Sequence, residues 1–232
     1  MGSLQLHASF RRFGPALLLI LFGASLAACG GSDDDNGDGS GGNPPGPPPP
    51  PPPTLPTLSP TPISLDDDHQ VGVDHWPNGN TSTGGQGQDI GAMTCLASQS
   101  NTFHQHTHVS VFLNGEQLSF PAMVGFVTGS SPASDCHYPL HTHDKSGLIH
   151  QHGTSPQNFT LGQVFQVWGQ PLSTTNFAGE TGLPIVVYVT DGSTVTVASG
   201  NWADIPLNSH REITVQIGTA ITEIPNYTWT GN

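Results

Sequence analysis

The sequence predicts an α+β domain in which one helix packs across a mixed β-sheet. Three patterns predict it. Apolar and polar residues alternate over Phe103–Leu113, as they do in a strand with one buried face. A capped amphipathic segment over Phe159–Gly169 is typical of a single helix. Further runs rich in β-branched residues, which follow that helix and end at Ile217, indicate additional strands.

The segment Phe103–Leu113 is the first predicted strand of the domain. Val109 and Val111 fall on odd positions and the histidines fall on even positions, so the two kinds of side chain face opposite sides of the sheet. Asn114-Gly115 is a strong signal for a two-residue hairpin turn. Glu116–Pro121 is therefore the predicted return strand.

A second, shorter hairpin carries four more histidines. Tyr138–His143 and Leu148–His152 are predicted strands, and the four residues between them form the turn. A loop of this even length pairs His141 with His150, so that all four histidines of this hairpin share one face. An odd length would split them across the sheet.

The predicted helix has a start signal, an apolar stripe and a stop signal. Thr160 and Gln163 have the spacing of a capping box. Gly169 is suited to the left-handed position just after the helix. The buried stripe follows the spacing i, i+3, i+4, i+7 and consists of Leu161, Val164, Phe165 and Trp168.

The remaining elements complete the predicted sheet. Pro184–Thr190 is a buried strand that turns into Thr194–Ala198, Asn201–Leu207 is a loop, and Glu212–Ile217 is the last strand. This order suggests a β-grasp (ubiquitin-like) arrangement with the histidine-rich hairpin as an elaboration. A β-sandwich or a cupin-like barrel is the alternative, because cupins also carry His-x-His, although they lack a long capped helix.

The N-terminus predicts export. Residues 1–28 combine Arg11 and Arg12 with a short apolar stretch, as in a signal peptide. They end in Leu26-Ala27-Ala28-Cys29, which resembles the lipobox of bacterial lipoproteins. That resemblance implies cleavage before Cys29 and lipid on this residue, which would place the protein in the cell envelope, in the periplasm or at the outer membrane.

Residues 29–89 are predicted to be a disordered tether. They contain a Gly/Ser/Asp tract and the unbroken run Pro47–Pro53, which favours polyproline II. A single domain is predicted over 90–232. It holds eight acidic and two basic side chains, a formal charge of −6 with neutral histidines. This balance argues against binding to nucleic acid.

Two cysteines remain once Cys29 is lipidated. In an exported protein they most often pair, so a Cys95–Cys136 disulfide is predicted. A Cys–His metal site is the alternative, because Cys136 adjoins His137.

Histidines concentrate in one part of the chain, and this predicts a metal site. Eight of the twelve lie between His104 and His152, and imidazole is a common ligand of transition metals. The predicted metal ligands are His106, His108, His141, His143, His150, His152 and His104. Outer candidates are His137 and His210, while Asp135 and Asp144 could bind or orient imidazoles.

Imidazole-rich sites without thiolate suit copper(II), zinc, nickel or iron(II), and we rank copper first and zinc second. The favoured function is a membrane-tethered protein that captures or passes on metal. A mononuclear metalloenzyme and a surface protein with a structural metal are the alternatives. No zinc-protease helix motif, Gly-x-Ser-x-Gly element or Walker element is present.

The histidine hairpin also resembles a recurring segment of uncharacterised exported bacterial and archaeal domains. The shared pattern is Cys-x-Tyr-x-Leu-His-Thr-His-Asp followed by Gly-x-Ile-His, found here over Cys136–His150. Related segments often carry Glu where this chain has His152. The resemblance implies a metal site but no particular reaction.

Overall fold

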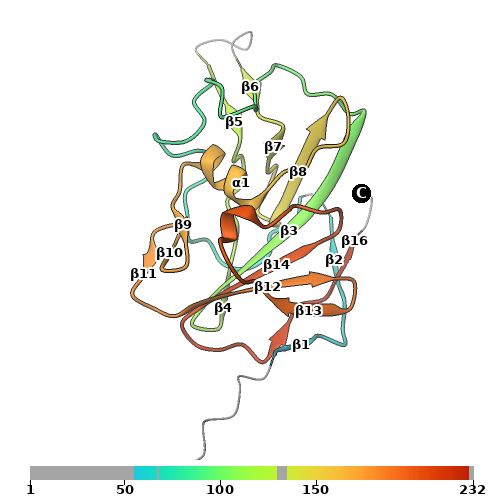
Figure 1. The fold of residues 1–232 in the computed structure, drawn as a ribbon, viewed down its shortest axis with the longest axis vertical. Coiled ribbons are helices and arrows are strands. Elements are labelled where there is room, and N and C mark those ends of the chain that lie inside the picture. Colours follow the sequence, from blue (N-terminus) through green and yellow to red (C-terminus); the bar gives the residue numbers. More distant parts are fainter. Residues whose placement is uncertain (1–54, 67, 130–134, 230–232) are drawn as a thin grey trace, which may run out of the picture. The chain divides into compact units, whose positions relative to one another are not determined.

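The computed structural model describes residues 55–66, 68–129 and 135–229. It has the predicted α+β fold, in which the helix α1 (Leu161–Trp168) packs against a mixed seven-stranded sheet (Figure 1). The helix begins and ends where its caps predict. Gln163 Oε1 accepts a hydrogen bond from the Thr160 backbone N–H at 2.9 Å, and Gly169 adopts the left-handed conformation with φ 82°.

The main sheet has two parallel strands at its centre. These are β3 (Phe103–Leu113) and β14 (Glu212–Ile217), the first and last long strands of the domain. All other pairs are antiparallel. The remaining strands are β13 (Thr194–Val197), β12 (Ile185–Asp191), β8 (Leu148–Gly153), β7 (Leu140–His141) and β4 (Glu116–Leu118). Their order, β13-β12-β14-β3-β8-β7 with β4 beside β3, is the predicted β-grasp arrangement.

Strand β3 is long enough to take two partners on one edge. Its first half pairs with β8 and its second half pairs with β4. Asn114 and Gly115 form the tight turn between β3 and β4, both with positive φ as such a turn requires. The described strands form no closed barrel, so the cupin-like alternative is wrong.

The hydrophobic core lies on one face of this sheet. Val109 and Val111 of β3 are buried there together with Ile213 and Val215 of β14, and the apolar stripe of α1 covers them. Because side chains alternate along a strand, the even-numbered side chains of β3 face the other way. The core therefore determines which face carries the histidines.

Several short elements complete the described structure. The predicted loop 201–207 contains a short 3₁₀ helix, η2 (Trp202–Asp204). The short strands are β1 (Thr57–Leu58), β2 (Ile63–Leu65), β5 (Phe126–Val127), β6 (Cys136–His137), β9 (Leu172–Ser173), β10 (Asn176–Phe177), β11 (Glu180–Thr181), β15 (Glu223–Ile224) and β16 (Tyr227–Trp229). Strand β1 pairs with β15 and β2 with β16, both parallel.

The predicted domain boundary between residues 89 and 90 does not match the structure. Residues 55–66 and 68–89 pack on the domain, and Leu65 is fully buried. Backbone N–H groups of Thr81 and Gly85 donate to the carbonyls of Trp168 and Val167 at the end of α1. Because these contacts are made by backbone atoms, a composition rich in Gly, Asn and Thr does not reveal them.

The structure tests the predicted cysteine pairing, whereas most of the predictions for the N-terminal part of the chain fall outside the described residues. The Cys95–Cys136 disulfide is confirmed, with an S–S distance of 2.01 Å, which removes the alternative of a Cys–His metal site. The signal peptide, Cys29 and the tether up to residue 54 lie outside the described residues. No helix in the described part of the chain is long and apolar enough to span a bilayer.

Substitution of Leu65 tests whether the segment before Ile90 belongs to the folded domain. Leu65→Ala is expected to lower the free energy of unfolding by about 2–5 kcal/mol, because it empties a buried site. Chemical denaturation measures the change. Leu55→Ala, at a leucine that is 50% exposed in the same segment, is the control and should change stability by less than about 0.5 kcal/mol. Equal small effects of both variants would contradict the packing.

Candidate metal centre

The pairing of β3, β8 and β7 brings five histidines to one face of the sheet. His104 lies opposite His152 and His106 lies opposite His150 in the β3–β8 ladder. His141 of β7 lies opposite His150 on the other edge of β8, as predicted. All five occupy positions that share one face, and this face is opposite the core. The even register that the sequence required is therefore confirmed.

A sixth histidine approaches this face from the turn after β7. The ring of His143 stacks on His150 with centroids 4.0 Å apart. Its Nε2 lies 3.1 Å from Nε2 of His141. We call the resulting group the histidine cluster; its members are His104, His106, His141, His143, His150 and His152.

Within the histidine cluster, nitrogen atoms converge closely enough to hold a metal ion. One ligand atom from each of His104, His106 and His150 lies within 4.8 Å of the other two. The same holds for His141, His150 and His152. Metal–nitrogen bonds of about 2.0–2.1 Å place tetrahedral ligands roughly 3.3 Å apart. Small movements of side chains would therefore bring either group onto an ion.

Hydrogen bonds from neighbouring groups orient the rings. Nδ1 of His141 lies 2.9 Å from the carbonyl oxygen of Tyr138, which can only accept, so Nδ1 carries the proton and Nε2 faces the cluster. Nδ1 of His152 lies 2.9 Å from Oδ1 of Asn101. Such contacts fix the tautomer and aim the second ring nitrogen at a metal.

Burial keeps these imidazoles neutral. Burial, and then repulsion from neighbouring imidazoles, lowers the pKa of His106 to about 3 and that of His152 to about 4. Burial also lowers the pKa of His141 to about 2, against an opposing hydrogen bond to Tyr138. The pKa of His150 is lowered further by the same causes. A neutral ring nitrogen has the lone pair that a metal requires.

His108, a predicted ligand, does not join the histidine cluster. Its Nε2 donates to the carbonyl oxygen of Ser146 at 2.7 Å, and its Nδ1 is bonded to the Glu212 carboxylate. Ser146 lies just before β8, at the end of this strand away from the histidine cluster, and Glu212 is the first residue of β14. The Ser110 hydroxyl also donates a hydrogen bond to Glu212, at 2.7 Å. The two-residue alternation places His108 on the same face as the other histidines. It could not show that the ring of His108 pairs with the buried carboxylate of Glu212.

The outer candidates belong to neither group of converging nitrogens, although the ring of His137 lies 5.1 Å from that of His141. His137 stacks on Phe126, and burial lowers its pKa, but it belongs to neither group. His210 packs against Trp229. Asp135 accepts a hydrogen bond from the Gly129 backbone, and Asp144 accepts one from the Ser146 backbone. Neither carboxylate makes the predicted contact with an imidazole in the described structure.

A hollow of about 390 Å³ opens onto the histidine cluster. Five histidines of the cluster line it, all except His106, together with His137, Ser98, Gln99, Asn101 and Phe126. The cluster is therefore accessible from one side. Nothing in the local sequence of Asn101 or Phe126 shows that Asn101 contacts His152 and that Phe126 of β5 packs beside His141, so these two residues were not predicted.

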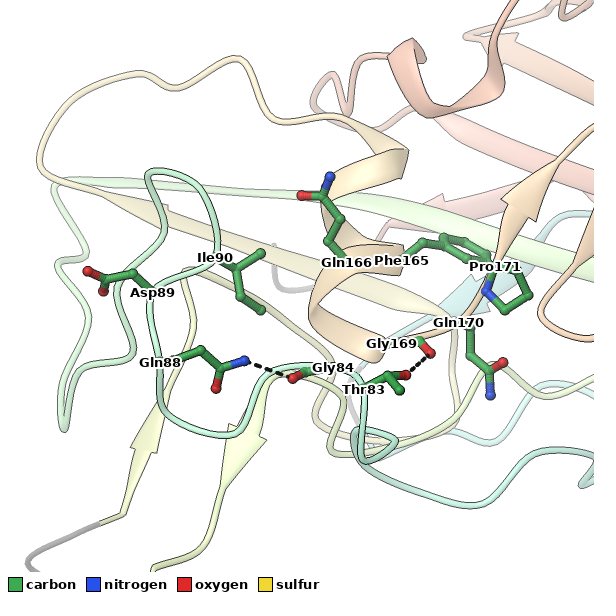
Figure 2. A pocket seen from close by; sticks show the side chains of 10 residues that line it. All are labelled: Thr83, Gly84, Gln88, Asp89, Ile90, Phe165, Gln166, Gly169, Gln170 and Pro171. Atoms are coloured by element: carbon green, nitrogen blue, oxygen red, sulfur yellow. Dashed lines mark hydrogen bonds between the residues drawn. The ribbon is translucent and has the colours of Figure 1, made fainter.

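A second hollow lies at the C-terminal end of α1, away from the histidines. Figure 2 shows its lining, in which the Thr83 hydroxyl donates to the carbonyl oxygen of Gly169 at 2.9 Å. Gln88 Nε2 donates to the Gly84 carbonyl oxygen at 3.0 Å in the same view. Asp89 is the only ionisable residue of this lining. The first bond attaches Thr83 to the end of α1, the second is internal to residues 84–88, and neither assembles a reactive group.

Comparison with known proteins gives no relative. No protein-family model matches the chain, no curated protein matches it, and no solved structure matches it. The histidine cluster, which is able to hold a metal ion, is therefore the feature of the molecule that indicates a function.

The metal-free protein is expected to lose stability as the pH falls from about 7 to 4. In the unfolded chain His106, His141 and His152 take up protons near their ordinary pKa of 6.5, whereas in the folded protein their pKa values lie between about 2 and 4. The unfolded state therefore binds more protons throughout this window, and acid favours it. Denaturant titrations at a series of pH values measure the slope.

His141→Leu is the matched variant for this pH dependence. It removes one buried imidazole whose pKa is strongly lowered, so the loss of stability between pH 7 and 4 should be smaller than in the unsubstituted protein. An unchanged slope in His141→Leu would contradict the assignment of the pH dependence to the cluster.

Proposed function

We propose that the chain is a membrane-tethered, extracytoplasmic protein that binds a transition metal, copper in first place and zinc in second. The observation that carries the proposal is the convergence of six imidazoles from three chain segments on one face of the sheet. The coordinating groups are neutral nitrogen ligands without thiolate, and such sites suit these metals.

The burial of the rings supports a metal site over a solvent-facing polar strip. His106, His141 and His150 are at most 3% exposed. Leaving polar groups out of contact with water costs free energy unless they find partners. These rings already have partners, among them each other and the Tyr138 carbonyl oxygen, and a bound cation would add a strong interaction with several ring nitrogens at once.

A metalloenzyme is the second candidate, and the hollow above the histidine cluster favours it. A catalytic metal keeps one position open to water or substrate, and this hollow would give access to such a position. Two acidic residues of the histidine-rich region that could act as a general base, Asp135 and Asp144, make other contacts. A binding protein therefore remains the proposed function.

The location in the cell envelope is proposed from the lipobox. Cys29→Ser is expected to move the protein from the membrane fraction to the soluble extracytoplasmic fraction, because the lipid attachment site is lost. Fractionation followed by immunoblotting measures this. The unsubstituted protein is the control, and membrane retention of Cys29→Ser would contradict anchoring by this residue.

Metal binding is tested with untagged protein, because a polyhistidine tag would itself bind metal. Isothermal titration with copper(II) and with zinc should give saturable binding. The double variant His141→Ala with His143→Ala should weaken the affinity at least tenfold, because it removes two converging nitrogens. His75→Ala is the control; this histidine pairs with Glu180 outside the cluster and should leave the affinity unchanged.

Stability provides a second measure of the same binding. Metal at a hundred times its dissociation constant should raise the free energy of unfolding by about 2.7 kcal/mol. A chelator should reverse this increase. The absence of both saturable binding and thermal stabilisation would overturn the proposed function.

A further inference from the structure

We propose that the histidine cluster holds two transition-metal ions side by side. His104, His106 and His150, which converge as one group, would bind the first ion. His141 and His152, which converge in a second group together with His150, would bind the second ion, with His143 beside His141 as their third ligand. This inference rests on the proposed metal-binding function and adds the number of ions and their ligands.

The number of converging rings exceeds what one four-coordinate ion uses. Copper(II) and zinc in imidazole sites take about four strong ligands, and the histidine cluster supplies six. The rings also do not share one centre. Among the described residues, the nitrogens within 4.8 Å of one another form two groups, and His106 and His141 never occur in the same group.

The first set is built on the β3–β8 ladder. His106 Nε2 lies 2.8 Å from Nδ1 of His150, directly across the ladder. The ring of His104 meets the edge of His106 with centroids 4.4 Å apart. These three rings come from paired strands, so the sheet itself holds them at a fixed spacing.

The second set is built on β7, β8 and the turn after β7. His141 and His152 belong to one group of converging nitrogens, and their rings lie 5.0 Å apart. His143 adds a nitrogen 3.1 Å from Nε2 of His141. His150 is the third member of this group, but its Nδ1 lies 2.8 Å from Nε2 of His106, so we assign it to the first ion. Its ring therefore lies between the two proposed ions.

The charges indicate what else such a centre would bind. Two divalent ions bring four positive charges, and all six imidazoles are neutral ligands. Neither group of converging nitrogens includes a carboxylate from the described residues. A small anion from solvent, such as hydroxide or chloride, would offset part of this charge. The hollow lined by five of the six rings gives it a route to both ions.

Two single variants separate a two-ion centre from a one-ion centre. His104 and His143 are the exposed members of the two sets, so replacing either by Ala should preserve the fold. The untagged protein is saturated with copper(II) and desalted, and its copper content is measured by mass spectrometry. We expect two copper ions per chain in the unsubstituted protein and in His75→Ala, and one in each single variant.

Electron paramagnetic resonance provides an independent readout. Two copper(II) ions held this close should broaden each other's signal, and either single variant should restore the narrower signal of an isolated ion. Circular dichroism and the melting temperature of the metal-free variants check the fold.

The possible results point to different conclusions. One copper per chain in the unsubstituted protein, with both variants weakening that same ion, would overturn the two-ion centre and leave the metal-binding function intact. No saturable copper at all would overturn the proposed function itself.

Discussion

The pairing of β3 with β8 is the constraint on which the candidate site depends. Side chains alternate along a strand, so this single register places His104, His106, His150 and His152 on one face. The opposite face of β3 contributes Val109 and Val111 to the core. A slip of one residue in β3 would expose the valines and bury the histidines in apolar surroundings. The hydrophobic core therefore fixes the position of the imidazoles.

The same packing changes the chemistry of these rings. The edge strand β7 and the turn after it bring His141 and His143 beside β8, and burial lowers the pKa of the most enclosed rings. Burial thus favours the form that binds metal and disfavours the form that binds a proton. Burial is the main cause of these lowered pKa values, and neighbouring imidazoles add to it.

The loops around the histidine cluster are held by covalent and polar contacts. The disulfide joins Cys95 to Cys136, which lies beside His137 and ahead of the β7 strand. Leu96 and His137 also exchange backbone hydrogen bonds, so the loop after Cys95 is aligned with β6. Farther along this loop, Asn101 reaches His152. The disulfide therefore restrains two of the segments that border the open side of the cluster.

Local patterns in the sequence determined much of this protein. The alternation of apolar and polar residues predicted β3 and the face of its histidines, and the capping residues predicted α1. The even loop length predicted the pairing of His141 with His150. These features follow from steric rules that act over a few residues, so a single sequence contains them.

Only the tertiary structure decided the rest. It paired His108 with Glu212, brought Asn101 to His152, and attached residues 81–85 to the end of α1. Each of these contacts joins segments far apart in the chain, or joins backbone atoms that every residue type possesses. No local residue pattern specifies such a partner, because the choice depends on how the whole sheet and its loops pack together.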